Sequence, residues 1–89
     1  MRFSWDLSKD LLNQRDHGIT FQEATTVFGD SLAVTVSDPD HSIGEERLIT
    51  IGQSSSGRLL VVCHIEQGDT IRIISARRAT AHEGKDYET

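Results

Sequence analysis

The sequence has one cysteine and no long hydrophobic run, and each of these two features excludes a class of protein. Cys63 cannot form an internal disulfide, so a disulfide-stapled secreted domain is excluded. No apolar stretch approaches the roughly 20 residues that span a bilayer, and residues 1–6 contain no apolar signal core. We therefore expect a cytoplasmic protein with no membrane association, whose cysteine is a buried thiol within an apolar run.

Positive charge is also scarce. The 89 residues include nine lysines and arginines against fourteen aspartates and glutamates, for a net charge of −5. This balance argues against general nucleic-acid binding. Residues 1–46 hold three basic and nine acidic residues, whereas residues 47–89 hold six basic and five acidic ones. A basic site is therefore expected in the second half of what the length predicts to be a single domain, residues 1–89.

The first half begins with helical patterns. Residues 3–5 are predicted to form a short strand or an extended lead-in. A helix capped by Asp6 or Ser8 should follow and run to about Asp16, ending at Gly18, which can adopt the left-handed conformation. One side of this helix carries its apolar residues, Leu7, Leu11 and Leu12.

A second helix is predicted directly after the first. Thr20 and Glu23 form the pattern of a capping box, in which Thr20 caps the helix and Glu23 reaches back to its start. This helix should end at Gly29. The capping role gives Glu23 a structural explanation.

The second half is rich in β-branched residues and predicts strands. A short turn at residues 67–69 requires its two flanking strands to be antiparallel. Thr80 and Glu83 form a second capping box, which opens a short C-terminal helix. The predicted fold is therefore α+β, with two N-terminal helices packed on a four-stranded antiparallel sheet. The predicted strands are residues 32–36, 47–53, 58–65 (central) and 70–78.

An acidic loop at residues 37–46 raises the question of a metal. It contains His41 among several carboxylates, Asp38, Asp40, Glu45 and Glu46. The spacing matches neither an EF-hand loop nor a zinc signature. We expect a solvated loop, no metal site and no cofactor, with a metal hydrolase as the minor alternative.

The residues best suited to bind an anion are a group of arginines at strand ends. Arg58 opens the predicted central strand, and Arg77 and Arg78 close its hairpin partner. Because antiparallel neighbours bring the start of one strand beside the end of the next, these guanidiniums should meet at one end of the sheet. Together they would match a phosphate. Each could instead pair with a carboxylate, and the candidates are Glu83, Asp86, Glu88 and those of the acidic loop. Arg47 lies at the far end of its own strand.

Proton carriers for cleavage of RNA by its own 2′-hydroxyl are also present. The candidates are His17, His82 and Tyr87, whereas His64 sits in an apolar run and is better explained as a core residue. His17 could equally be a helix C-terminal residue that interacts with the helix dipole.

Nearly the whole chain resembles the BrnT toxins. The most specific segments are His17-Gly18-Ile19-x-Phe21-x-Glu23-Ala24 and Arg72-Ile73-Ile74-Ser75-Ala76-Arg77-Arg78-Ala79. Supporting segments are Phe3-x-Trp5-Asp6, Glu46-Arg47, and Gly57-Arg58-Leu59-Leu60.

This resemblance implies the toxin of a bacterial type II toxin–antitoxin pair with a RelE-like fold. It implies metal-independent RNA cleavage that inhibits translation, and neutralisation by a BrnA-like ribbon-helix-helix antitoxin, through which alone the toxin would reach operator DNA. By position, Arg58, Arg77 and Tyr87 resemble the catalytic residues of RelE-like toxins, and we add His17. The candidates for RNA binding are Lys9, Arg47 and Arg78. The acidic net charge motivates the alternative, a non-enzymatic antitoxin-binding module with the same fold.

Overall fold

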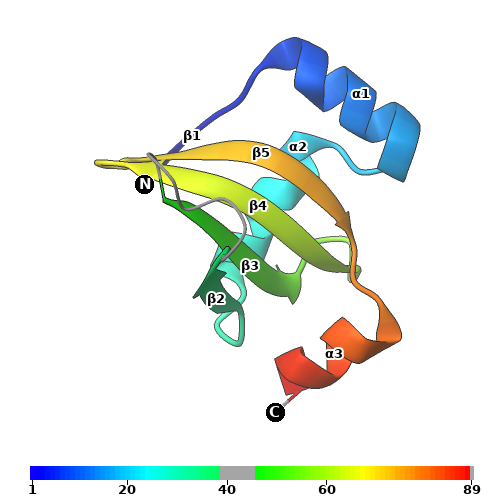
Figure 1. Cartoon of the computed structure of the whole chain (residues 1–89). Coiled ribbons are helices and arrows are strands. Elements are labelled where there is room, and N and C mark those ends of the chain that lie inside the picture. Colours follow the sequence, from blue (N-terminus) through cyan, green and yellow to red (C-terminus); the bar gives the residue numbers. More distant parts are fainter. Residues whose placement is uncertain (39–45, 89) are drawn as a thin grey trace.

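The computed structural model describes residues 1–38 and 46–88, so most of the acidic loop considered as a metal site (residues 39–45) lies outside the described part. The chain forms an α+β fold in which helices accompany a five-stranded sheet of order β1-β5-β4-β3-β2 (Figure 1). The elements in chain order are β1 (Arg2–Ser4), α1 (Leu7–His17), α2 (Phe21–Thr25), the 3-10 helix η1 (Thr26–Gly29), β2 (Val34–Ser37), β3 (Arg47–Gln53), β4 (Leu59–Gln67), β5 (Thr70–Arg78) and α3 (Ala81–Glu88).

The prediction of four antiparallel strands was wrong in one respect. The sheet is mixed, because β1 adds to the outer edge of β5 in parallel, with Phe3 beside Ile71. The short strand or extended lead-in predicted for residues 3–5 is a strand, at Arg2–Ser4, but its place in the sheet was not predicted because its partner lies far away in the sequence. The remaining pairs are antiparallel, as predicted.

Strand β4 is central, as its apolar run predicted. It joins β5 through a tight hairpin in which Gly68 has a φ of 60°, a conformation that glycine adopts without strain. The pairing places Val61 opposite Arg77 and Leu60 opposite Arg78. Alternate residues of β4 therefore point to opposite sides of the sheet.

The main hydrophobic cluster lies on one side of the sheet, although β4 also has buried apolar residues on the other side. On the side of the main cluster, the buried residues Leu60, Val62 and Ile73 meet Phe21 and Val27 of the second helical segment. We call this the helix side, and the opposite side of the sheet the open face. Core formation on one side leaves the open face available for other contacts.

Helix α1 packs differently from what its leucines suggest. Its caps are as predicted, with Asp6 accepting a hydrogen bond from the backbone of Lys9 and Gly18 at a φ of 70°. Its three leucines, however, are 68, 58 and 48% exposed, in chain order. The residue that α1 buries is Asn13.

Asn13 bonds to the outer edge of β5 where β1 has ended. Its Nδ2 donates to the carbonyl oxygens of Ala76 at 2.8 Å and Ile19 at 2.9 Å. Its Oδ1 accepts from the backbone N–H of Ala76 at 3.1 Å. One amide side chain thus satisfies both backbone groups of a buried strand residue, a task that a neighbouring strand usually performs.

We expect Asn13→Ala to lower the free energy of unfolding by about 2–4 kcal/mol, because it leaves buried backbone groups without partners. Urea denaturation measures the change. Gln14→Ala, an exposed change on the same helix, is the matched control and should have little effect. Equal stabilities of the two variants would contradict this account of how α1 is held.

His64 is a core residue, as the sequence predicted. It is 0% exposed, and its ring stands edge-on to Phe28 at a centroid distance of 4.9 Å. Its Nε2 lies 2.7 Å from the hydroxyl of Thr50. Within the described part of the chain its Nδ1 is buried with no hydrogen-bond partner. Burial lowers the pKa of His64 from 6.5 to about 4.

We expect the protein to lose stability as the pH falls from 6.5 towards 4. In this window the unfolded chain binds a proton at His64 and the folded chain does not, which costs up to about 3 kcal/mol. Denaturation at pH 7, 5.5 and 4.5 measures the slope, and His64→Gln should flatten it. An unchanged slope in that variant would show that another group is responsible.

Candidate active site

Arg58, just before β4, is bound by a carboxylate of α2. Its Nε donates to Oε2 of Glu23 at 3.0 Å, and its Nη2 donates to Oε1. The same carboxylate accepts hydrogen bonds from the hydroxyls of Ser54 and Ser56, at 2.7 and 2.6 Å. Arg58 is the main cause that lowers the pKa of Glu23 to about 2. This network fastens the β3–β4 turn to the helix side of the sheet.

The role predicted for Glu23 was therefore half right. Thr20 caps α2, since its hydroxyl accepts a hydrogen bond from the backbone N–H of Glu23 at 3.0 Å. The carboxylate of Glu23 does not complete the capping box and binds Arg58 instead. A hydrogen bond between two charged groups is stronger than one to a neutral backbone N–H, which explains the preference.

Arg77, near the end of β5, is bound by α3. Its two terminal nitrogens donate to the two carboxylate oxygens of Glu83, both at 2.7 Å. Glu83 also completes the predicted capping box, because Thr80 donates its backbone N–H to the carboxylate and accepts the backbone N–H of Glu83. Arg77 is the main cause that lowers the pKa of Glu83 to about 2.

Tyr87 fixes the far end of the same helix. Its hydroxyl donates to Oδ2 of Asp30 at 2.6 Å. Asp30 also accepts the backbone N–H groups of Gln53 at 2.8 Å and Leu32 at 3.0 Å. The bond to Asp30 raises the pKa of Tyr87, so the hydroxyl is held in its protonated form. α3 is thus attached at both ends, after β5 and beside β3 (Figure 1).

The start of β4 and the end of β5 lie side by side as predicted, but the guanidiniums of Arg58 and Arg77 do not meet. The backbone of Ala79 donates to the carbonyl of Leu59 at 2.9 Å, so the start of β4 lies beside the end of β5. Arg58 leaves the sheet towards α2, whereas Arg77 pairs with Val61 and leaves towards α3. The two cations therefore project from opposite sides of the sheet, each with its own carboxylate.

The remaining candidate residues for catalysis and RNA binding lie in different parts of the molecule. His17 is exposed at the end of α1, which runs along β5 towards its last residues (Figure 1). Arg78 is exposed and pairs with Leu60 on the helix side. Lys9 is exposed on α1. Arg47 stands opposite Ile65, at the other end of the sheet from Arg77.

The alternative that an arginine pairs with Glu83 is confirmed for Arg77. Nothing local in the sequence indicated that Glu23 would bind Arg58 or that Asp30 would bind Tyr87. Cys63 is half-buried on the open face, not fully buried, and burial raises the pKa of its thiol.

Among the described residues, no group of three or more His, Cys, Asp or Glu side chains could hold a metal ion. In the same part of the chain, no helix is long and apolar enough to cross a membrane.

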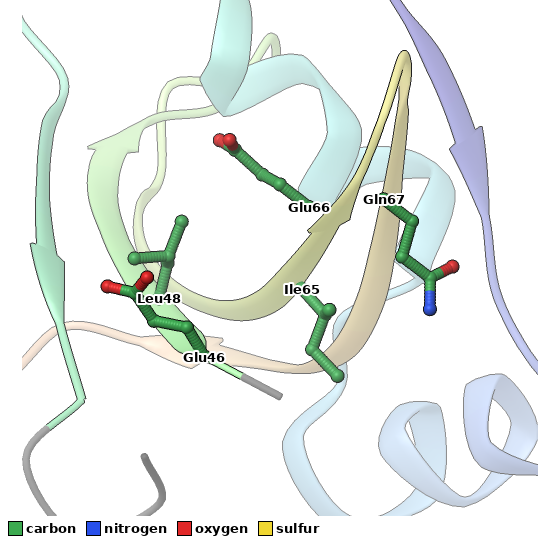
Figure 2. A pocket seen from close by; sticks show the side chains of 5 residues that line it. All are labelled: Glu46, Leu48, Ile65, Glu66 and Gln67. Carbon is green, nitrogen blue, oxygen red and sulfur yellow. The ribbon is translucent and has the colours of Figure 1, made fainter. Parts of the chain in front are cut away.

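A hollow of about 430 Å³ opens at the end of the sheet opposite Arg77. Figure 2 shows the residues that line it, Glu46, Leu48, Ile65, Glu66 and Gln67. Two of them are carboxylates and none is basic, so a phosphate would be repelled. The hollow is therefore no candidate for an RNA site.

We expect Glu83→Gln to loosen α3 at neutral pH, because a neutral amide cannot replace the bidentate ion pair. The pair is partly exposed and worth up to about 1 kcal/mol, so backbone amides of α3 should exchange with solvent up to about fivefold faster. In the unchanged protein the contribution of Glu83 is complete above pH 4.5 and disappears as the pH falls towards 2.

Hydrogen exchange followed by mass spectrometry measures both effects. Lys85→Gln changes an exposed charge on the same helix and is the matched control. Identical exchange in the two variants would show that Arg77 does not anchor α3.

Comparison with known proteins places the chain in a family. The structure is similar to the 1.1 Å crystal structure of the Brucella abortus ribonuclease toxin BrnT, with a TM-score of 0.66 and 23% identity over 90% of this chain and 97% of that one. At this identity the likeness shows a shared fold. A search of curated proteins gave no match. The model of a family described as the ribonuclease toxin BrnT of type II toxin–antitoxin systems matches residues 5–83. The chain therefore belongs to the BrnT family of type II toxins.

Proposed function

We propose that this chain is a ribonuclease that cleaves RNA without a metal ion and thereby inhibits translation in the cytoplasm. The observation that carries the proposal is the family match over residues 5–83, which includes both arginine-bearing strand ends. In this reaction the 2′-oxygen of RNA gives its proton to a base and bonds to the adjacent phosphorus, while the bond from phosphorus to the 5′-oxygen of the next nucleotide breaks and an acid protonates that oxygen. The protein must neutralise that phosphate and move a proton.

Arg77 is the best candidate to bind the phosphate. Its guanidinium already binds a carboxylate through two parallel hydrogen bonds, and a phosphate presents the same geometry. Binding RNA would require Glu83 to give up this contact. The substrate phosphate and Glu83 are therefore competitors for one cation.

Proton transfer is assigned to two candidates. Tyr87 is the candidate acid because of its position on the last helix, and to act it would have to release its hydrogen bond to Asp30 and donate to the substrate instead. His17, exposed at the end of α1, suits the role of a base. Arg58 and Arg78 lie on the helix side at the same end of the sheet and would contact flanking phosphates, as would Lys9 and Arg47 further away.

A BrnA-like antitoxin is the proposed partner. It would neutralise the toxin and carry it to operator DNA. We retain one alternative, an antitoxin-binding module without nuclease activity, because Arg58 and Arg77 are both already neutralised by carboxylates.

The two proposals are separated by RNA cleavage with the purified chain and by growth of bacteria that produce it. We expect cleavage and growth arrest with the unchanged chain. Arg77→Ala should reduce cleavage roughly a hundredfold or more, as the loss of a group that stabilises transition-state charge does. No cleavage and no arrest by the unchanged chain would establish the alternative.

Glu83→Gln distinguishes catalysis by Arg77 from a structural role. Both Arg77→Ala and Glu83→Gln break the contact with α3, but only the second leaves the cation free. We expect Glu83→Gln to retain or raise cleavage. If both variants lose activity equally, Arg77 acts by holding α3 and does not bind the substrate.

A further inference from the structure

The open face carries positive charge that no strand residue balances. In the strand register, Arg47 of β3 and Arg72 of β5 flank Ile65 of β4 on this face. Arg77 projects from the same face further along β5. The only acidic residue within the strands, Glu66, stands opposite Ile71 and so points to the helix side. Glu83 already neutralises Arg77, so the positive charge that this face offers to a partner is that of Arg47 and Arg72.

The same face is lined by aliphatic side chains. Two rows cross the strands in register: Val36, Ile49 and Cys63 form one, and Val34, Ile51 and Val61 form the other. The rows reach the surface at β2, the edge strand of the sheet, where Val34 and Val36 are 41 and 51% exposed. Leu32, just before β2, is 68% exposed. Val61, at the β4 end of its row, is only 7% exposed, so the surface that a partner can reach consists of the β2 end of the rows together with Arg47 and Arg72.

We propose that this open face, from the β2 edge to Arg72, binds an amphipathic segment of the antitoxin that carries aspartate or glutamate beside aliphatic residues. The inference rests on the proposed function for the existence of that partner, and it adds the surface and the chemistry of the segment. Aliphatic side chains would cover the two rows, and carboxylates would pair with Arg47 and Arg72. Charge pairs of this kind set the rate and specificity of association.

Two other occupants fit the surface less well. Single-stranded RNA binds sheet faces by stacking its bases on aromatic side chains, and the described strands present none on this face, since Phe3 packs into the core on the helix side. A second copy of the chain would place the same arginines against each other, which costs binding energy. Asp38, which follows β2, is 8% exposed, but besides burial its charge helps to raise the pKa of the Cys63 thiol on the open face, and so it offsets part of the charge of Arg47 there.

The test uses the protein encoded by the reading frame next to this chain's, purified with it as a complex. Binding is measured by isothermal titration calorimetry after the two chains are separated. We expect Arg72→Glu and Val36→Asp each to weaken binding roughly tenfold, and binding of the unchanged chain to weaken with salt. Arg15→Glu, an exposed charge reversal on α1, is the matched control and should leave affinity unchanged.

RNA cleavage by the same variants identifies the occupant. We expect Arg72→Glu to cleave RNA within about twofold of the unchanged chain while it escapes neutralisation. Thermal unfolding confirms that the variants fold. Loss of cleavage with unchanged antitoxin affinity would make this face an RNA surface and overturn the proposal. A homodimer that Val36→Asp dissociates would overturn it as well.

The outcome also separates this inference from the function on which it rests. If the unchanged chain forms no complex with the neighbouring protein, the proposed antitoxin partnership fails and the inference fails with it. If a complex forms and none of the open-face variants affects it, the partnership stands and only the surface assigned here is wrong.

Discussion

The amide of Asn13 is the contact on which the arrangement of the N-terminal half depends. It bonds to both backbone groups of Ala76 and to the carbonyl of Ile19, so one side chain connects α1, the turn before α2 and the exposed edge of β5. β1 covers only the first residues of that edge. Because this polar contact holds α1, the leucines of the helix are free to face solvent, and the core is left to the segment from Ile19 to Val27.

Three carboxylates set the electrostatics of the other end of the sheet. Glu23 holds Arg58, Glu83 holds Arg77, and Asp30 holds the hydroxyl of Tyr87. Each contact joins a helix, or the segment that follows a helix, to another element. The residues proposed for catalysis therefore also stabilise the fold. An anionic substrate must compete with these internal anions. Because Glu23 and Glu83 neutralise Arg58 and Arg77, this acidic chain keeps cations at strand ends without a strongly basic surface there.

The two sides of the sheet carry different groups of residues. The helix side holds the core, the neutral His64 and the Arg58 network, whereas the open face holds aliphatic rows between arginines. α3 meets the end of the sheet near Leu59 and is attached through Arg77 and Tyr87. The proposed substrate contact and the proposed partner surface are therefore adjacent, and both are reached from the side that the N-terminal helices leave uncovered.

The sequence alone determined the local elements of this protein: the caps of α1 and α3, strand β3 at its observed ends, the central position of β4 and the burial of His64. Motif resemblance also indicated the BrnT family. These features depend on residues close together in the chain. Tertiary structure alone decided the parallel pairing of β1, the polar contact that holds α1, and the binding of Arg58 by Glu23 instead of a completed capping box. In each case the partners are distant in sequence, and a stronger long-range contact displaced the local one.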